Sequence, residues 1–374
     1  MTRMHELLER VPGLALATGI AVVATVIGRL VPLIGGPVSG IIMGVILATA
    51  IKPGPRLRVG IRAASTSVLQ LSVVVLGSQL SLAQIAKVGL ESLPIMIGTL
   101  AVCLAAAWLI GRWLGITGNL RTLIGVGTGI CGASAIAAVT PVIGAVGIDV
   151  AYAISTIFLF NIGAVLIFPI IGHVLGLSQH AFGLYAGTAV NDMSSVVATA
   201  TTYGPAAANY AVVVKLVRTL MIIPVSFGLA SWAGRRDAAA ELTAAQGVAT
   251  QGVASGSTAV LVSARVPVPV SAEVPVHAPI ARARVHVRRL VPWFLVGFIL
   301  VAAANSTGLI PAGAHSGLSA TSVLLITIAL SAIGLSTDLA GFRRAGAKPL
   351  MLGASLWVIV SLTSLGLQFA TGLN

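Results

Sequence analysis

The chain has 374 residues, of which 57% are hydrophobic and only 8% are charged, and its mean hydropathy is +1.04. Soluble domains carry about 25% charged residues, so this composition excludes an ordinary soluble protein and predicts an all-α membrane protein. The net charge of +13 does not indicate a nucleic-acid partner, because the cations lie in short loops between apolar runs, where they orient the chain in a bilayer.

The apolar runs predict about eleven transmembrane helices, since a span needs about 20 apolar residues. The first run has no small-residue cleavage site, so we expect it to be retained rather than removed as a signal peptide. The second run is short and interrupted by glycine, which predicts a tilted or partial span. The expected spans are 11–30, 36–51, 64–82, 93–114, 120–146, 150–175, 181–202, 206–232, 290–310, 318–339 and 349–373.

The cations test this count. With the N-terminus in the cytoplasm, all but four of the 22 Lys and Arg residues lie on the cytoplasmic side. Only Arg29 and Lys87 face outward, and Lys215 and Arg218 lie within a span. The pattern predicts a multi-pass protein of the cytoplasmic membrane, with its N-terminus inside and its C-terminus outside.

The chain divides into three parts. Residues 1–232 form a first membrane part that includes the interrupted helices, and residues 290–374 hold the last three spans. Between them, 233–289 is rich in Ala, Val and Pro and contains VPVPV. Proline lacks a backbone donor and the segment has no helical period, so we expect a disordered cytoplasmic linker.

An internal repeat joins the two membrane parts. The segment that starts at Ser65 matches the one that starts at Ala320, and the same offset of 255 pairs Pro94 with Pro349 and Gly98 with Gly353. Chance similarity between apolar helices is the alternative. The matched spans are seven apart and so run in opposite directions, which predicts inverted repeats of the kind found in secondary transporters.

The fifth span, LIGVGTGICGASAIAAVTP at 123–141, is interrupted by glycines and a proline. Broken helices occur at membrane depth where the freed backbone faces protein or a water-filled cavity. A half-helix that begins near Gly132 would direct its amides at an anion, with Thr128, Gly129 and Ser134 beside it. A glycine-lined packing groove between helices is the alternative.

The seventh span holds GTAVNDMSSVVATATT at 187–202, with a polar group of Asn191, Asp192, Ser194 and Ser195. A charge at bilayer depth costs roughly 2.5–3.5 kcal/mol on insertion scales, which favours a functional role. The alternative places Asp192 at a helix end in the headgroup layer.

This span resembles the fifth at an offset of 60, which puts Gly132 opposite Asp192. The match predicts two interrupted helices that share one midplane site. On a continuous helix, Thr188, Asp192 and Ser195 would share a face.

The eighth span contains two cations, Lys215 and Arg218, three residues apart. We expect one of them to pair with Asp192 and the other to supply a positive field for an anionic substrate. Orientation anchors in the cytoplasmic third of the bilayer are the alternative.

The motifs GTGICGASAIAAVTPVI, GTAVNDMSSVVATA and VVVKLVRTLMIIPV occur in this order, and together they resemble the YeiH-type sulfate exporter family. The resemblance runs from about residue 36 to the C-terminus, apart from the long linker. It implies a relation to bile-acid/sodium symporters and sodium/proton antiporters, with a panel domain, a core domain and crossed discontinuous helices. It also implies sulfate or a related sulfur-containing anion as the substrate.

The expected function is therefore export of a small inorganic or organic anion by a secondary active transporter. Asp192 would be the coupling residue, with a proton or sodium as the coupling ion. An anion channel and a membrane enzyme that acts on lipid stay open as alternatives, although no enzymatic motif, cofactor site or metal site is indicated. The lipid bilayer is the expected surrounding, and the glycine-rich faces leave a homodimer open.

Overall fold

The computed structural model describes residues 2–30, 35–51, 54–232, 235, 293–336 and 346–373. All regular elements in this part of the chain are helices. Seven helices are long and apolar enough to cross a membrane and three apolar helices are shorter. The all-α membrane class is confirmed, but the count of eleven spans is not. The expected linker at 233–289 lies outside the described residues, apart from Arg235.

One group of helices, here called the panel, packs around α2 and α15. Gly44 and Gly334 lie where these two helices touch, and a Cβ on either glycine would meet the backbone of the other helix. Small residues of this kind let membrane helices approach closely. The panel comprises α1 (Thr2–Leu30), α2 (Gly35–Ile51), α3 (Pro55–Ala63), η1 (Ala64–Val68), α4 (Leu69–Leu76), η2 (Gly77–Gln79), α14 (Trp293–Ser306) and α15 (His315–Leu335).

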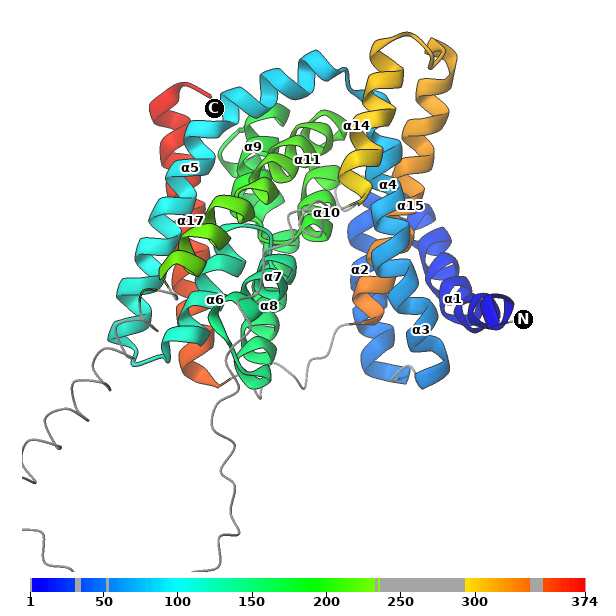
Figure 1. Ribbon diagram of the computed structural model, residues 1–374. Coiled ribbons are helices and arrows are strands. Elements are labelled where there is room, and N and C mark those ends of the chain that lie inside the picture. The colour runs from blue at the N-terminus through cyan, green and yellow to red at the C-terminus, as the bar shows by residue number, and fades with distance from the viewer. Residues whose placement is uncertain are drawn as a thin grey trace, which may run out of the picture.

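The remaining helices form a second group, here called the core, which lies beside the panel in Figure 1. Each group takes helices from both sides of the 233–289 segment. The core comprises α5 (Leu82–Trp113), α6 (Gly118–Gly129), α7 (Ala133–Ile143), α8 (Gly147–Val174), α9 (Gln179–Ala189), α10 (Met193–Tyr203), α11 (Pro205–Leu220), whose helix continues to Trp232, and α17 (Ala347–Thr371).

The two ends of the bundle differ in charge. One end holds the start of α3, the end of α5 and the start of α6, with Arg56, Arg58, Arg62, Arg112 and Arg121. It lies at the bottom of Figure 1 and is here called the basic end. The C-terminus and the first turns of α5, with a single lysine, lie at the opposite end.

The helices α9 and α10 form a hairpin that enters the core from the opposite end. The Tyr203 hydroxyl at the end of α10 donates to the carbonyl of Leu177, just before α9, at 2.6 Å. The ring of Tyr203 stacks on Phe182 in the first turn of α9, with ring centroids 3.8 Å apart. Because the two outer ends of this pair touch, the segment turns back and does not cross the bundle.

The helices α6 and α7 form a second hairpin that enters from the basic end. A Cβ on Gly127 would lie 3.0 Å from the Ile136 side chain, so the two helices lie against each other. The next helix, α8, starts at Gly147 and runs beside α17 from the basic end, where Gly353 contacts Thr156. The chain therefore leaves α7 at the end where it entered α6.

These hairpins correct the expectation that 120–146 and 181–202 each cross the bundle. Both segments are discontinuous, as expected, but each consists of half-helices of 11 or 12 residues. Such a half-helix is about 17 Å long, roughly half the thickness of a bilayer core. The distribution of Lys and Arg could not distinguish a hairpin from a crossing span here, because the connections at 144–147 and 175–178 contain no Lys or Arg.

The helices of the internal match run in opposite directions. Gly98 on α5 meets Leu367 on α17, and Gly115 after α5 lies near Lys348 at the start of α17, so these helices are antiparallel. The amide of Gln79 after α4 likewise donates to the carbonyl of His315 at the start of α15, at 3.2 Å. Both observations agree with the expected directions, while the repeat symmetry itself stays a prediction.

Candidate functional site

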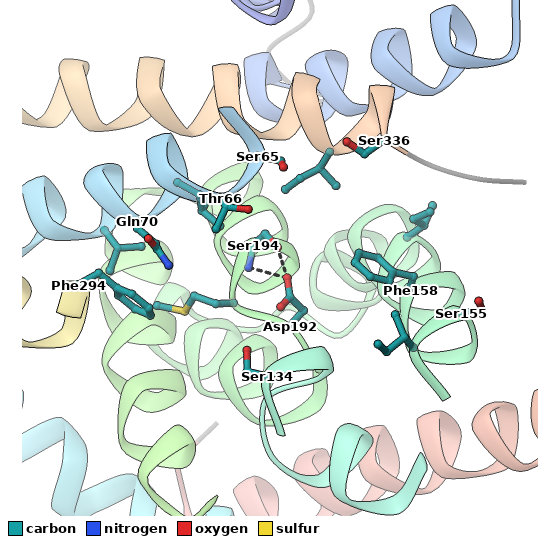
Figure 2. Close-up of a pocket in the computed structure, with 16 residues that line it drawn as sticks. Ser65, Thr66, Gln70, Ser134, Ser155, Phe158, Asp192, Ser194, Phe294 and Ser336 are labelled. Carbon is teal, nitrogen blue, oxygen red and sulfur yellow. Dashed lines mark hydrogen bonds between the residues drawn. The ribbon is translucent and has the colours of Figure 1, made fainter. Parts of the chain in front are cut away.

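A cavity of about 370 Å³ lies between the panel and the core, where the hairpin tips meet (Figure 2). The helices α8, α14 and α15 contribute residues from the parts nearer the basic end. The cavity therefore extends from the hairpin tips toward that end. Its lining residues are Ser65, Thr66, Leu69, Gln70, Val73, Ser134, Ile154, Ser155, Phe158, Ile162, Asp192, Met193, Ser194, Phe294, Ile333 and Ser336.

The core wall is built on α8 and on the first turns of α7 and α10. Ser134 lies in the first turn of α7, and Asp192 is the N-cap of α10. The Asp192 carboxylate accepts hydrogen bonds from the backbone amide of Ser194, at 3.0 Å, and from the Ser194 hydroxyl. Each helix N-terminus carries about half a positive charge, so both half-helices direct a positive field into the cavity.

The two hairpin tips touch each other. A Cβ on Gly132 would lie 3.3 Å from the Asp192 Cβ, and Gly132 adopts φ +69°, which favours glycine. Gly132 is the N-cap of α7, as Asp192 is of α10. The sequence match that put these residues opposite each other is confirmed by their equivalent places in the two hairpins.

The break between α9 and α10 is held by a side chain from α8. The Asn161 Oδ1 accepts hydrogen bonds from the backbone amides of Asn191, at 3.2 Å, and Asp192, at 3.4 Å. These amides lie outside the helical ladder in a buried or partly buried place, so an external acceptor satisfies them. Asn161 thereby fixes the direction in which Asp192 enters the cavity.

The panel wall contains a short π-helical turn, η1 (Ala64–Val68), which places Ser65 and Thr66 at the cavity. Such turns are rare and frequently lie at functional sites. One turn further, Gln70 accepts a hydrogen bond from Trp293 Nε1 at 2.8 Å, which ties α4 to the start of α14. The panel thus offers neutral polar groups opposite Asp192.

Two fully buried cations lie behind the hairpin tips. Lys215 and Arg218 on α11 are both 0% exposed. The Lys215 ammonium donates to the carbonyls of Ile130 and Val190, at 2.8 Å each. These carbonyls follow the ends of α6 and α9, so one ammonium joins both hairpins.

The Arg218 guanidinium completes this arrangement. Its Nε donates to the carbonyl of Gly129 at 2.7 Å, its Nη2 to that of Thr128 at 3.4 Å, and its Nη1 to that of Thr188. The last carbonyls of a helix lack intrahelical partners and carry a partial negative charge. The two cations therefore cap the C-terminal ends of α6 and α9, which explains their burial without a carboxylate.

The chain matches a known family over most of its length. The family described as "Conserved hypothetical protein 698" matches residues 12–353. The chain belongs to this family. Several relatives are called UPF0324 membrane proteins. One from Streptococcus pyogenes serotype M6 is 37% identical, over 99% of this chain and 100% of the relative's length. One from Streptococcus mutans is 38% identical, over 98% of this chain and 98% of the relative's length. A relative from Fusobacterium nucleatum is 35% identical over 96% of this chain and 98% of its own.

The resemblance to the YeiH-type family drawn from the three motifs is thereby confirmed. Those motifs cover both hairpin tips, all of α7, most of α10 and the second half of α11. In this member of the UPF0324 family they form the part of the core wall at the hairpin tips and the cation pair behind it.

The sequence-predicted site residues fall into two sets. Ser134, Asp192 and Ser194 line the cavity, and Gly132 touches Asp192 at its edge. The others lie outside the cavity lining, and Asn191 and Ser195 are buried beyond it. The second set is Thr128, Gly129, Asn191, Ser195, Lys215 and Arg218.

Two expectations about contacts are wrong. All three charged residues are described, and no ion pair joins Asp192 to Lys215 or Arg218. The cations bind backbone carbonyls because the helix ends present these acceptors closer than the carboxylate. Thr188, Asp192 and Ser195 also do not share a helix face, because the helix breaks between α9 and α10.

Sequence reasoning missed most of the panel wall. Ser65 and Thr66 belong to the repeated segment and Ser336 to its partner, so the match itself was a usable signal. Nothing local in the sequence marked Ser155 or Phe294, since each lies in an ordinary apolar stretch. Among the described residues, no cluster of three His, Cys, Asp or Glu side chains could hold a metal ion.

Proposed function

We propose that the protein is a secondary active transporter that exports a small anion, sulfate or a related sulfur-containing anion, across the cytoplasmic membrane. The observation that carries the proposal is the cavity between panel and core, into which two half-helix N-termini point from hairpins that enter from opposite ends. Midplane sites built from discontinuous helices are typical of secondary transporters.

The positive-inside rule puts the basic end in the cytoplasm. On this orientation the N-terminus is inside and the C-terminus outside. The cavity, which extends toward the basic end, would then load from the cytoplasm, as export requires.

The opposite end of the pathway is closed by apolar packing between the two bodies. The helices α2 and α15 of the panel contact α10 of the core. Panel residues Val38 and Leu330 belong to one buried apolar cluster with core residues Val197 and Val212. Rocking of the core against the panel would open this cluster and close the cavity, which is alternating access.

Asp192 is the one charged residue among the described residues that line the cavity. Two like charges about 5 Å apart repel by about 3 kcal/mol at an effective dielectric constant of 20, which is roughly a hundredfold in affinity. The anion therefore binds well only when a proton, or sodium in its place, neutralises this carboxylate. This linkage makes Asp192 the coupling residue.

The capping cations support the same reading. Lys215 and Arg218 carry two positive charges against the single carboxylate, and their carbonyl partners hold them in place. The core around the cavity thus keeps a net positive charge that favours an anion, without direct contact between either cation and the substrate.

The test is uptake of radiolabelled sulfate into proteoliposomes over a range of internal and external pH, with a sulfonate and acetate as competitors. We expect uptake driven by a proton gradient in the wild type and uptake independent of pH in Asp192→Asn. Asp149→Asn, which removes a carboxylate at the start of α8 outside the cavity lining, is the matched control.

Three results would contradict the proposal. If Asp192→Asn keeps the pH dependence of the wild type, the coupling role is wrong. Flux that is linear in voltage and insensitive to a counter-gradient would indicate a channel. Turnover of lipid by the purified protein, without sulfate flux, would indicate an enzyme.

A further inference from the structure

A polar stripe runs along one face of α17 inside the core. Trp357, Ser361, Ser364 and Gln368 are spaced four, three and four residues apart, so they share a helix face. This face meets α9, where the Ser364 and Thr188 hydroxyls lie 2.6 Å apart. The Gln368 amide donates to the Ser364 hydroxyl at 3.1 Å, which extends the stripe toward the C-terminus.

Several polar atoms of this interface are buried without a protein partner. They are the Tyr185 hydroxyl, the Trp357 indole nitrogen, the Ser361 hydroxyl and the Gln368 amide oxygen. The Tyr185 and Ser361 hydroxyls lie near each other, but neither makes a hydrogen bond of good geometry. Tyr185 is 0% exposed, Gln368 1% and Ser361 8%, so neither bulk water nor lipid headgroups reach them. An unpaired buried polar group costs about 1–3 kcal/mol, so several in one interface call for a partner such as an ordered water.

Aromatic packing fixes the orientation of the Trp357 and Tyr185 side chains. Phe168 on α8 stacks on Trp357, with centroids 5.1 Å apart, and lies 4.7 Å from the Tyr185 ring. The aromatic side chains fix the direction of the indole nitrogen and the phenol, so neither can turn away to find another partner.

The stripe begins near the opposite end and passes the last turn of α9. At the opposite end, a second cavity of about 580 Å³ is lined by Leu184, Gly372 and Leu373, where α9 and α17 end their contact. Further inward, Thr188 in the last turn of α9 meets the stripe at Ser364, between Gln368 and Ser361, and the carbonyl of Thr188 is bound by Arg218.

We propose that the α9–α17 interface binds a file of ordered waters, bridging Gln368, Ser361, Tyr185 and Trp357, that leads inward from the opposite end past the contact of Thr188 with Ser364. Buried waters typically make about three hydrogen bonds to groups of this kind. The stripe includes the hydroxyls of Tyr185, Ser361 and Ser364, and hydroxyls relay protons. The file gives protons a path into the core that is separate from the substrate cavity and does not depend on the transported species.

The test is X-ray hydroxyl-radical labelling of the full-length protein in nanodiscs, because radicals form from waters bound beside a buried side chain. We expect Tyr185 to be labelled several-fold faster than Phe298, after correction for intrinsic reactivity. Phe298 is 1% exposed and lies in an apolar cluster. Labelling of Tyr185 at the rate of Phe298 would overturn the proposal.

Two variants sharpen the test. Ser361→Val combined with Gln368→Leu fills the interface with apolar groups and should reduce Tyr185 labelling to the rate of Phe298. Ser355→Ala, which removes a hydroxyl from another face of α17, should leave it unchanged. Unchanged labelling in the double variant would overturn the proposal.

A stability measurement covers the case in which the double variant fails to fold. In a dry interface, Ser361→Ala removes an unpaired hydroxyl and raises the thermal midpoint. In a hydrated interface the midpoint stays or falls, because a bound water loses a partner. A higher midpoint would therefore also overturn the proposal.

Discussion

Replacing Lys215 by methionine separates a capping role from a substrate-binding role. The Lys215 ammonium donates to the carbonyls of Ile130 and Val190, and both hydrogen bonds are lost in the variant. Methionine occupies a similar volume, so no large cavity forms and water does not replace the ammonium. Each carbonyl left without a donor costs about 1–3 kcal/mol, which gives about 2–6 kcal/mol of destabilisation in total.

The assay is the thermal midpoint of the purified protein in detergent, measured by size exclusion after heating. Lys87→Met is the matched control, because Lys87 is 75% exposed and its ion pair with Glu91 spans 3.8 Å. An exposed pair of this kind contributes about 0.2–1 kcal/mol. We expect a clearly lower midpoint for Lys215→Met and almost no change for the control.

The two roles predict different patterns. If Lys215 caps the hairpins, the variant loses stability with and without sulfate. If it bound the substrate directly, the variant would keep its midpoint but lose the stabilisation that sulfate confers on the wild type. A midpoint for Lys215→Met within error of Lys87→Met would refute the capping argument.

Three further predictions concern the hairpins. Gly132→Ala should destabilise the protein by about 1–3 kcal/mol, because a φ of +69° strains an L residue and the new Cβ crowds Asp192. The control is Gly163→Ala, where nothing lies within 4 Å of the new Cβ, and it should leave the thermal midpoint unchanged. Tyr203→Phe should cost about 0.5–1.5 kcal/mol in the same measurement, since it removes the hydrogen bond to Leu177 that closes the α9–α10 hairpin. Val146→Cys should react with a membrane-impermeant thiol reagent from the cytoplasmic side and Leu175→Cys from the outside, with low background because Cys103 and Cys131 are buried. The reverse pattern of labelling would mean that both segments cross the membrane.

The sequence by itself determined the class of protein, its family and the places where helices break. Low charge and long apolar runs leave a membrane as the only suitable solvent. The glycines before Ser134 and the polar group around Asp192 marked both breaks, since neither stretch continues a helix cheaply in lipid. The sequence also showed two cations within the eighth span, where burial of a charge is costly and indicates a specific role.

Only the tertiary structure decided what these features do. An apolar stretch of about 25 residues is long enough for one crossing helix or for two half-helices, and three residues at each tip set the direction of the second half. Packing chooses between these outcomes, through contacts such as Tyr203 with Leu177. The partners of Lys215 and Arg218 were hidden for the same reason: backbone carbonyls carry no sequence signal, so their convergence on α11 follows from the hairpins and not from the residues around them.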